Sequence, residues 1–315
     1  MSEEFYFDDD KSLKRNSVVS QHSGPCLAES GDSIIIECIH CGFAHVLPLP
    51  DERILKELYQ KNYFVSENTD YFKQYERDGD WWVLNFSDRY EFFEKKLEAT
   101  QRSLLDIGSG AGFFLQVGKN RGWAVKGIEP SRSAATYAKK MGLEVENDFF
   151  TENTESLGQF DVVNLTAVLE HVPDPKAFLR NAVSHLKNNG ILCLSVPNDF
   201  NPFQKILVDH CDTDAWWVVP DHHLNYFNHH SLRKLVESEG LVPIYQTTSF
   251  PIDIFLLMGD NYLVDEGLGR ASHKRRVNFE RKLKIAGKDD LRRKLYESFA
   301  GLDIGREVIL YAQKQ

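Results

Sequence analysis

The sequence predicts an α/β protein with a central, mainly parallel sheet covered by helices on both faces. Between residues 100 and 248, apolar strand-like runs alternate with helical segments of about ten residues. A glycine-rich turn joins the first of these strands to the first helix, as in doubly wound sheets. The chain of 315 residues, 42% of them hydrophobic, is large enough for one such core and a smaller module.

The first hundred residues predict a small module followed by helices. Residues 1–25 are polar, and from 26 to 50 apolar strand-like sequence surrounds a Cys-x-x-Cys turn. A helix is expected directly after Asp51, because apolar residues recur there at helical spacing behind a capping residue. The aromatic segment 62–82 has no clear period, and a second helix is expected at about 84–99.

The alternating part then supplies the sheet and its helices. Strands are expected at SLLDIG, WAVKGIE, LEVEND, FDVVNLT and ILCLSVP, with helices at 112–120, SRSAATYAKKMG and PKAFLRNAVSHLKNNG. A helix at 230–239 and a strand at 241–248 continue the pattern, and GREVILYAQK closes it after a helical, charged insertion at 252–300. The predicted units are thus 1–50 (N-terminal tail and zinc-ribbon-like module), 51–99 (helical lid or linker), 100–250 (core) and 251–315 (helical insertion and closing strand).

The charge distribution limits the partners. The net charge of −10 disfavours nucleic acid as a partner, since that binding depends on neutralising phosphates. Arg270 to Lys294 nevertheless holds eleven Lys or Arg against three acids, either as a solvated helix face or as a contact for an anionic substrate group. No apolar run is long enough to span a bilayer and no signal-peptide core precedes the module, so we expect a cytoplasmic protein. The sequence leaves the oligomeric state open.

The glycine turn predicts a nucleoside ligand without a diphosphate. Gly108, Gly110 and Gly112 recur at every second position, which differs from the Gly-x-Gly-x-x-Gly of dinucleotide sites. Asp106 stands directly before the turn, where a carboxylate repels a diphosphate and suits an amino group. Glu129 ends the next strand, at the place where a carboxylate takes both hydroxyls of a ribose.

Three ordered motifs, DIGSGAG from Asp106, Glu129-Pro-Ser and FDVVNLTAVLEHVPDP, resemble those of class I S-adenosylmethionine-dependent methyltransferases. The resemblance covers about 100–248 and implies a Rossmann-like seven-stranded sheet with helices on both faces, whose last strand is antiparallel. It also implies that the chain binds S-adenosylmethionine as cofactor, with residues that carry over by position. These are Asp106, Gly108, Gly110 and Gly112 for the methionine part, Glu129 and Pro130 for the ribose, Asp148 or Phe149 for adenine, and Leu165, Thr166 and Ala167 for the methyl-donor pocket.

Histidines are the candidates for a general base. In this family a Glu-His pair like Glu170-His171 faces the active site, so His171 is either a base or a structural histidine. The segment PDHHLNYFNHHSL adds His222 or His223 as the leading base and Tyr226 as a pocket contact. We expect no metal there, because no acid or cysteine completes a ligand set, and we expect His229 and His230 to begin a helix capped by Asn228 or Ser231.

The Cys-x-x-Cys turn predicts half of a zinc knuckle. Cys38 and Cys41 supply two thiolates, and His22 and Cys26 upstream complete a possible Cys3His set for structural zinc, the alternative being a degenerate remnant. With the helix that follows, this layout resembles bacterial small-molecule methyltransferases with an N-terminal zinc-binding module, several of which act on sugars.

The predicted function is methyl transfer to a small-molecule acceptor. The looser resemblance favours a hydroxyl of a sugar or surface-polysaccharide precursor, with histidine as base and the basic segment at a phosphate of that anionic or nucleotide-linked substrate. The alternatives are an RNA or protein methyltransferase with a zinc-bearing recognition module, and a non-catalytic S-adenosylmethionine-binding protein. No Asn-Pro-Pro-aromatic tetrapeptide follows the fourth strand, which speaks against the amino-methylating enzymes.

Overall fold

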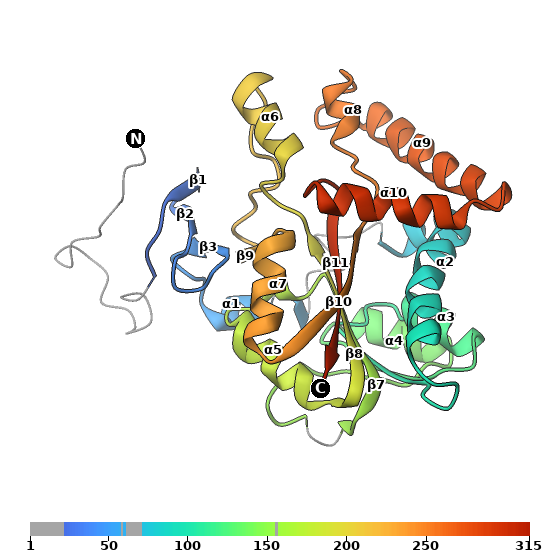
Figure 1. Cartoon of the computed structure of the whole chain (residues 1–315). Helices are drawn as coiled ribbons and strands as arrows, with labels where there is room; N and C mark the ends of the chain where they lie inside the picture. The colour runs from blue at the N-terminus through green and yellow to red at the C-terminus, as the bar shows by residue number, and fades with distance from the viewer. Residues whose placement is uncertain (1–21, 58, 61–70, 155–156) are drawn as a thin grey trace.

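The computed structural model describes residues 22–57, 59–60, 71–154 and 157–315, and within them the chain forms two sheets (Figure 1). The larger has seven strands in the order β10-β11-β8-β7-β4-β5-β6. Its strands are β4 (Ser103–Ile107), β5 (Ala124–Ile128), β6 (Val145–Glu146), β7 (Phe160–Thr166), β8 (Leu186–Pro197), β10 (Leu241–Thr248) and β11 (Glu307–Lys314).

Strand directions in this sheet agree with the prediction. Pairs β8-β7, β7-β4, β4-β5 and β5-β6 are parallel, whereas β11 is antiparallel to both of its neighbours. The strand order reverses at β4, so the ends of β4, β5 and β7 meet at one edge, where open α/β sheets bind ligands. The predicted seven-stranded, Rossmann-like fold is confirmed.

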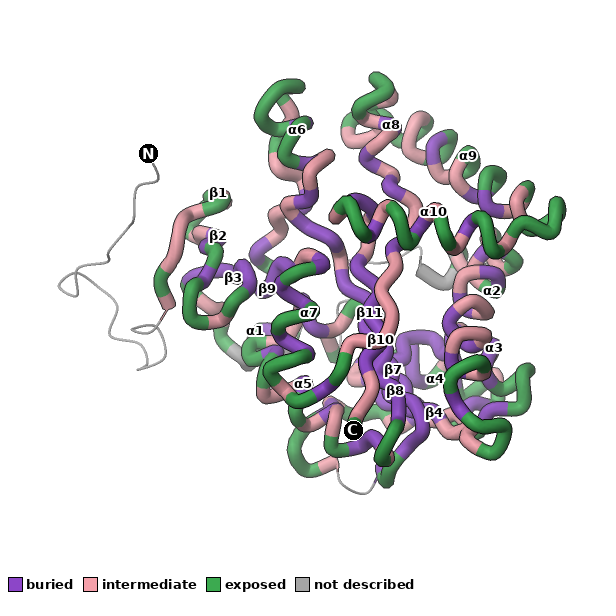
Figure 2. Tube along the Cα trace, viewed as in Figure 1, coloured by how far each residue is buried: buried purple, intermediate pink, exposed green. Residues whose placement is uncertain are grey.

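Helices cover both faces because successive strand residues point to opposite sides. Leu104 packs with α2 (Tyr71–Lys96), α3 (Phe113–Asn120) and α4 (Arg132–Lys140). Leu105 packs in a second cluster with α5 (Pro175–Ser184) and α7 (His229–Ser238). The central strands β4, β7, β8 and β11 are mostly buried, with exposed residues on the outer helices (Figure 2).

Helix α2 corrects one expectation. Residues 71–82 were expected to be irregular, yet α2 begins at Tyr71 and continues to Lys96 across a kink at Asp78, whose φ is −109° and ψ is 20°. The Asp78-Gly79-Asp80 run contains the kink and interrupts the apolar period, which hid the first part of the helix from sequence reasoning. Residues 62–70 of that segment lie outside the described part of the chain.

The N-terminal module is a small antiparallel sheet of β1 (Cys26–Ser30), β2 (Ser33–Glu37) and β3 (Ala44–Leu47), followed by α1 (Glu52–Glu57). Its fourth strand is β9 (Asn225–Tyr226), which belongs to the segment that leads into α7. Asn228 caps α7 and forms a capping box with Ser231, so His229 and His230 begin this helix as predicted. The module is therefore hydrogen-bonded to the core through β9 (Figure 1).

The remaining elements lie beyond the ligand-binding edge of the large sheet, in the upper part of Figure 1. They are α6 (Pro202–His210), α8 (Ile254–Leu257), α9 (Glu266–Ile285) and α10 (Asp289–Gly301). A separate short helix, η4 (Leu169–His171), follows β7. Among the residues that the structure describes, no helix is long and apolar enough to cross a membrane.

Candidate active site

The turn between β4 and α3 brings backbone amides to the edge of the sheet. Gly108 and Gly110 have φ of 72° and 53°, a left-handed conformation that favours glycine. A Cβ on Gly108 would lie 2.6 Å from Cγ2 of Val168, so only glycine fits between the turn and the segment after β7. The turn can thus approach a ligand closely from the backbone.

Glu129 follows β5 and faces this turn. Its two carboxylate oxygens accept hydrogen bonds from the backbone N–H groups of Gly110, at 2.8 Å, and Ser131, at 2.7 Å. A carboxylate has about four lone-pair positions, so one on each oxygen remains for a ligand donor. Burial raises the pKa of Glu129 to about 7, although the two backbone hydrogen bonds oppose the rise.

Asp106 is the second buried carboxylate at this edge. Its side chain accepts a hydrogen bond from Nδ2 of Asn164, on the neighbouring strand β7, at 2.7 Å. Burial raises the pKa of Asp106 to about 7, while Asn164 and the Arg89 guanidinium act in the opposite direction. A cationic amino group bound here would pair with Asp106 and offset the cost of burying its charge.

These groups line one cavity of about 620 Å³. Of the predicted cofactor residues, it is lined by Asp106, Gly108, Gly110, Glu129, Pro130, Phe149, Thr166 and Ala167. The structure therefore brings together residues that follow or end four strands, β4, β5, β6 and β7.

Three predicted cofactor residues do not line this cavity. A Cβ on Gly112 would lie 2.5 Å from Leu143 and 3.1 Å from Ala138, so this glycine allows α3 to pack close to α4. Leu165 is 1% exposed and packs in the core. Asp148 is exposed, and its side chain accepts a hydrogen bond from the backbone N–H of Phe149.

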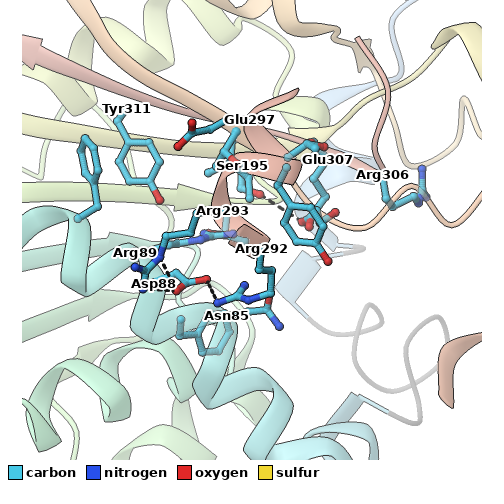
Figure 3. Close-up of a pocket in the computed structure, with 18 of the residues that line it drawn as sticks. Asn85, Asp88, Arg89, Ser195, Arg292, Arg293, Glu297, Arg306, Glu307 and Tyr311 are labelled. Carbon is cyan, nitrogen blue, oxygen red and sulfur yellow. Dashed lines mark hydrogen bonds and ion pairs between the residues drawn. The ribbon is translucent and has the colours of Figure 1, made fainter. Parts of the chain in front are cut away.

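A second cavity of about 770 Å³ adjoins the first, and Tyr75, Phe86, Thr166 and Ala167 line both. It lies between α2, the sheet edge and the helices α9 and α10 of the insertion (Figure 3). Arg89 of α2, which sequence reasoning missed, stands at the junction and donates a hydrogen bond to Oγ1 of Thr166 at 2.8 Å. The helical periodicity of α2 marks Arg89 only as a neighbour of Phe86, so the sequence held little signal for it.

The predicted histidines lie together, but they do not share a cavity. His171 lines the first cavity, and its Nδ1 lies 2.7 Å from the carbonyl oxygen of His222. His222, His223 and Tyr226 line neither cavity, and the Tyr226 hydroxyl instead accepts a hydrogen bond from the Val219 N–H. Burial lowers the pKa of His171 to about 4 and that of His223 to about 3, so both imidazoles are neutral at pH 7.

A buried acid accompanies these histidines, contrary to the expectation from the sequence. Ligand atoms of Glu170, His171 and His223 lie within 4.8 Å of one another, a spacing that could accommodate a metal ion. Sequence reasoning looked for an acid within the histidine-rich segment itself, whereas the fold brings Glu170 to it from η4.

The N-terminal module holds the second group with metal-ligand spacing: His22, Cys38, Cys41 and His45, with ligand atoms within 4.8 Å of one another. Nδ1 of His22 lies 3.5 Å from Sγ of Cys38 and 3.4 Å from Sγ of Cys41. Cys26 is outside this group, because it begins β1 and its Sγ contacts the Ala28 carbonyl oxygen at 3.5 Å. His45, four positions after Cys41, takes the fourth place and was missed because only upstream residues were considered.

Comparison with known families identifies the class of protein. The family described as a methyltransferase domain matches residues 74–246, which is more than half of the 315-residue chain. The chain therefore belongs to this methyltransferase family. The predicted membership in class I of the S-adenosylmethionine-dependent methyltransferases is confirmed, and the zinc module is a separate question.

The chain also matches curated proteins over about a third of its length. The chain is 33% identical over 119 residues to the ubiquinone biosynthesis O-methyltransferase of Marinobacter nauticus, covering 35% of this chain and 50% of that one. The protein of the same name from Caulobacter vibrioides is 38% identical over 103 residues, or 30% of this chain and 41% of that one. The chain thus matches about half the length of these curated relatives.

Solved structures show the fold. The magnesium protoporphyrin IX methyltransferase of Synechocystis, solved with S-adenosylhomocysteine, has a TM-score of 0.51 at 14% identity, covering 84% of this chain and 100% of that one. The plantazolicin methyltransferase BamL, solved with a triazolic desmethylPZN analogue and S-adenosylhomocysteine, has a TM-score of 0.52 at 17% identity, covering 83% of this chain and 95% of that one. At these identities the likeness establishes the fold and says nothing further about the substrate.

Proposed function

We propose that this chain uses S-adenosylmethionine to methylate a hydroxyl group of a small molecule held in the second cavity. The observation that carries the proposal is that Thr166 and Ala167, at the end of the strand predicted to face the methyl donor, line both cavities. S-adenosylmethionine, when bound, supplies an activated methyl group, so the protein has mainly to align the acceptor and receive its proton.

The residues of the first cavity fit this cofactor. The free lone pairs of Glu129 suit two neighbouring ribose hydroxyls, and Asp106 suits the amino group of the methionine part. Phe149 offers an apolar surface for the adenine. Gly108 has no side chain, so a ligand can approach its backbone closely. A diphosphate fits poorly, since both carboxylates line the same cavity.

His171 is the proposed proton acceptor, because it alone of the three predicted histidines lines either cavity. Its Nδ1 donates to the His222 carbonyl, which leaves Nε2 as the basic nitrogen. The acceptor oxygen bonds to the methyl carbon, the carbon–sulfur bond breaks with its electron pair on sulfur, and the hydroxyl proton passes to Nε2. His223 and Glu170 then act through His171, as its neighbours.

The test is an assay with trideuteromethyl S-adenosylmethionine and a panel of catechols, hydroxybenzoates, monosaccharides and nucleotide sugars, with products measured by mass spectrometry. We expect a trideuteromethyl ether and stoichiometric S-adenosylhomocysteine from at least one class. His171→Gln should lower kcat more strongly than it weakens S-adenosylhomocysteine binding, because His171 also lines the cofactor cavity. Exposed His210→Gln is the matched control. A label found only on nitrogen, or wild-type kcat in His171→Gln, would contradict the respective assignment.

The acceptor class is the finer part of the proposal. The looser resemblance favours a sugar or surface-polysaccharide precursor, whereas the curated relatives are named for ubiquinone biosynthesis. Aromatic side chains such as Trp81 and Trp82 line the second cavity and suit the flat faces of either ring type. The panel above decides between them, because it contains both classes.

We also propose that His22, Cys38, Cys41 and His45 hold a structural zinc ion. His45 Nδ1 lies 3.0 Å from the Val46 carbonyl oxygen, so it carries the proton and leaves Nε2 as the ligand atom. This buried Nε2 has no hydrogen-bond partner among the described residues, as expected of a nitrogen that binds a metal ion. Zinc bonds of about 2.0 Å to nitrogen and 2.3 Å to sulfur put tetrahedral ligands about 3.5 Å apart, close to the separations of His22 from the two cysteines.

Elemental analysis of the purified protein tests this ligand set. We expect about one zinc per chain in the wild type and in Cys26→Ser, and loss of most of the metal in His45→Ala and in Cys38→Ser. Zinc that depends on Cys26 and not on His45 would favour the original Cys3His prediction. A wild-type protein without zinc, even after refolding with the metal, would show the group to be a remnant.

A further inference from the structure

The second cavity contains more positive charge than its own carboxylates neutralise. Its lining includes seven cationic side chains, from Arg89, Lys95, Arg276, Arg292, Arg293, Lys294 and Arg306, and five carboxylates, from Asp88, Glu91, Asp290, Glu297 and Glu307. Arg292 and Arg293 are already paired, with Asp88 at 2.6 and 3.0 Å respectively.

Arg89 is the most unusual of them. It is only 7% exposed, yet no carboxylate of the described residues lies within 4.0 Å of its nitrogens. One of its terminal nitrogens donates to Thr166, and its guanidinium lies 5.9 Å from the centre of the Phe114 ring. A buried guanidinium is costly without an ionic partner, so a charge-complementary ligand would stabilise this arrangement.

Two further arginines add to the positive potential. Arg276 stacks on Trp81, with its guanidinium 4.7 Å from the ring centre, and has no carboxylate within 4.0 Å among the described residues. Nη1 of Arg306 has no hydrogen-bond partner in the described chain and lies 3.7 Å from Asp199. Burial lowers the pKa of Arg276, Arg306 adds to that effect, and Glu280 and Glu307 oppose it.

The nearby acids are engaged elsewhere. Glu307 accepts a hydrogen bond from Ser195 at 3.2 Å, and Glu297 accepts one from the Tyr245 hydroxyl at 2.7 Å. Glu280, behind the cavity wall, accepts hydrogen bonds from Trp81 and Tyr296, each at 2.6 Å. None of these carboxylates lies within ion-pair distance of Arg89 in the described part of the chain. Figure 3 shows Arg89, Glu297 and Glu307 in the cavity wall.

We infer that the second cavity is an anion-selective acceptor site, in which Arg89 binds a carboxylate or phosphate group of the acceptor and Arg276 and Arg306 contribute positive potential. The aromatic wall formed by Tyr75, Trp81, Trp82 and Phe86 takes the ring that carries the methylated hydroxyl. Because Arg89 also holds Thr166, the anion is bound beside the cofactor cavity. This inference rests on the proposed function, since the cavity receives an acceptor only if its neighbour holds the methyl donor.

The test measures whether the cavity prefers an anion. Benzoate and phenyl phosphate, as the carboxylate and phosphate probes, are each compared with uncharged benzyl alcohol at constant ionic strength. Quenching of tryptophan fluorescence reports binding, because Trp81 and Trp82 line the cavity. We expect at least one anion to bind about tenfold or more tightly than benzyl alcohol, since a charge-assisted hydrogen bond contributes that much.

Variants assign the preference to its residues. Arg89→Met removes the charge but keeps much of the side-chain volume, and it should abolish the preference while benzyl alcohol binds as before. Arg233→Met, an exposed arginine of α7 that lines neither cavity, should leave it unchanged. If circular dichroism shows that Arg89→Met is unfolded, Arg306→Met replaces it and should weaken the preferred anion at least twofold, a smaller effect because Arg306 acts at longer range.

Equal binding of all three probes to the wild type would overturn the inference, as would a preference that persists in the folded Arg89→Met variant or, in its place, in Arg306→Met. Titration of the same samples with S-adenosylhomocysteine separates this failure from failure of the proposed function. If the protein does not bind S-adenosylhomocysteine, the proposed function is wrong. If it binds S-adenosylhomocysteine but shows no anion preference, only the anion site is wrong. The benzoate and phenyl phosphate arms distinguish a carboxylate acceptor from a phosphorylated one.

Discussion

The ribose assignment of Glu129 gives the most direct test of the cofactor site. In Glu129→Gln one carboxylate oxygen becomes an amide nitrogen, which cannot accept a hydrogen bond from a ribose hydroxyl. It also cannot accept from whichever backbone N–H it meets, that of Gly110 or that of Ser131. A single charge-assisted hydrogen bond contributes about 2 kcal/mol, so S-adenosylhomocysteine should bind about 30-fold more weakly.

The pH dependence of S-adenosylhomocysteine affinity shows whether the charge of Glu129, and not only its shape, contributes to binding. The carboxylate is the form that accepts from ribose, and burial raises the pKa of Glu129 to about 7 in the ligand-free protein. Between pH 6 and pH 8 the carboxylate fraction of a group with that pKa rises about tenfold, so affinity should rise with pH in this window. Asp106 titrates in the same direction, so Glu129→Gln should retain a shallower rise.

Isothermal titration calorimetry with S-adenosylhomocysteine at pH 6, 7 and 8 measures both effects. Glu144→Gln is the control, because this exposed glutamate lies just before β6 and outside both cavities. Thermal unfolding without ligand checks that the variant is folded. If folded Glu129→Gln binds within about twofold of the wild type, with the same pH profile, the ribose contact is assigned to the wrong residue.

Three further outcomes are expected. Gly108→Ala should lose most S-adenosylhomocysteine affinity in calorimetry, because its Cβ would meet Val168 at 2.6 Å; unchanged affinity would mean that the turn does not contact the ligand. Gly112→Ala should instead lower the free energy of unfolding by about 2–4 kcal/mol in urea titrations, from overpacking against Leu143 and a left-handed backbone, and a fully stable variant would contradict the close packing of α3 and α4. Burial raises the pKa of Asp199 to about 7, so the folded protein binds this proton more tightly than the unfolded chain does. The free energy of unfolding therefore falls by up to about 1.4 kcal/mol per pH unit as the pH rises from 4 to 7. Asp199→Asn should therefore gain stability relative to the wild type from pH 5 to pH 7.5 in the same titrations, and a constant difference would show that the carboxyl does not titrate there.

The sheet could be predicted from the sequence because the local patterns in that part of the chain agree with one another. Strand β10 was expected at residues 241–248 and is found there. Its start was predictable because the helical period ends just before Gly240. The α7 cap at Asn228 was likewise predictable from two residues. The first turns of α2 were not, because Asp78-Gly79-Asp80 interrupts the period while packing of Tyr75 against Phe113, with ring centres 4.0 Å apart, keeps the helix in place.

For the site, motif residues were predictable and contacts between distant segments were not. Glu129 and Gly108 belong to a short ordered pattern, so their place followed from spacing. Arg89 has no motif, and its importance arises only when α2 folds over the end of β7. Cys26 was favoured as a zinc ligand because cysteine is common in that role, yet the direction of β1 carries it away from the group that His45 completes.

The N-terminal module has a structural consequence for the proposed base. His45, a proposed zinc ligand, pairs through its backbone with Asn225 of β9. The Asn225 side chain donates hydrogen bonds to the carbonyl oxygens of Leu169, at 2.9 Å, and Val172, at 2.7 Å, which enclose Glu170 and His171. The backbone N–H of Leu224 also donates to the Glu170 carbonyl at 2.7 Å. A zinc ion that fixes β3 would therefore restrict the position of His171 indirectly, through β9, so that loss of the proposed zinc should disturb the proposed base.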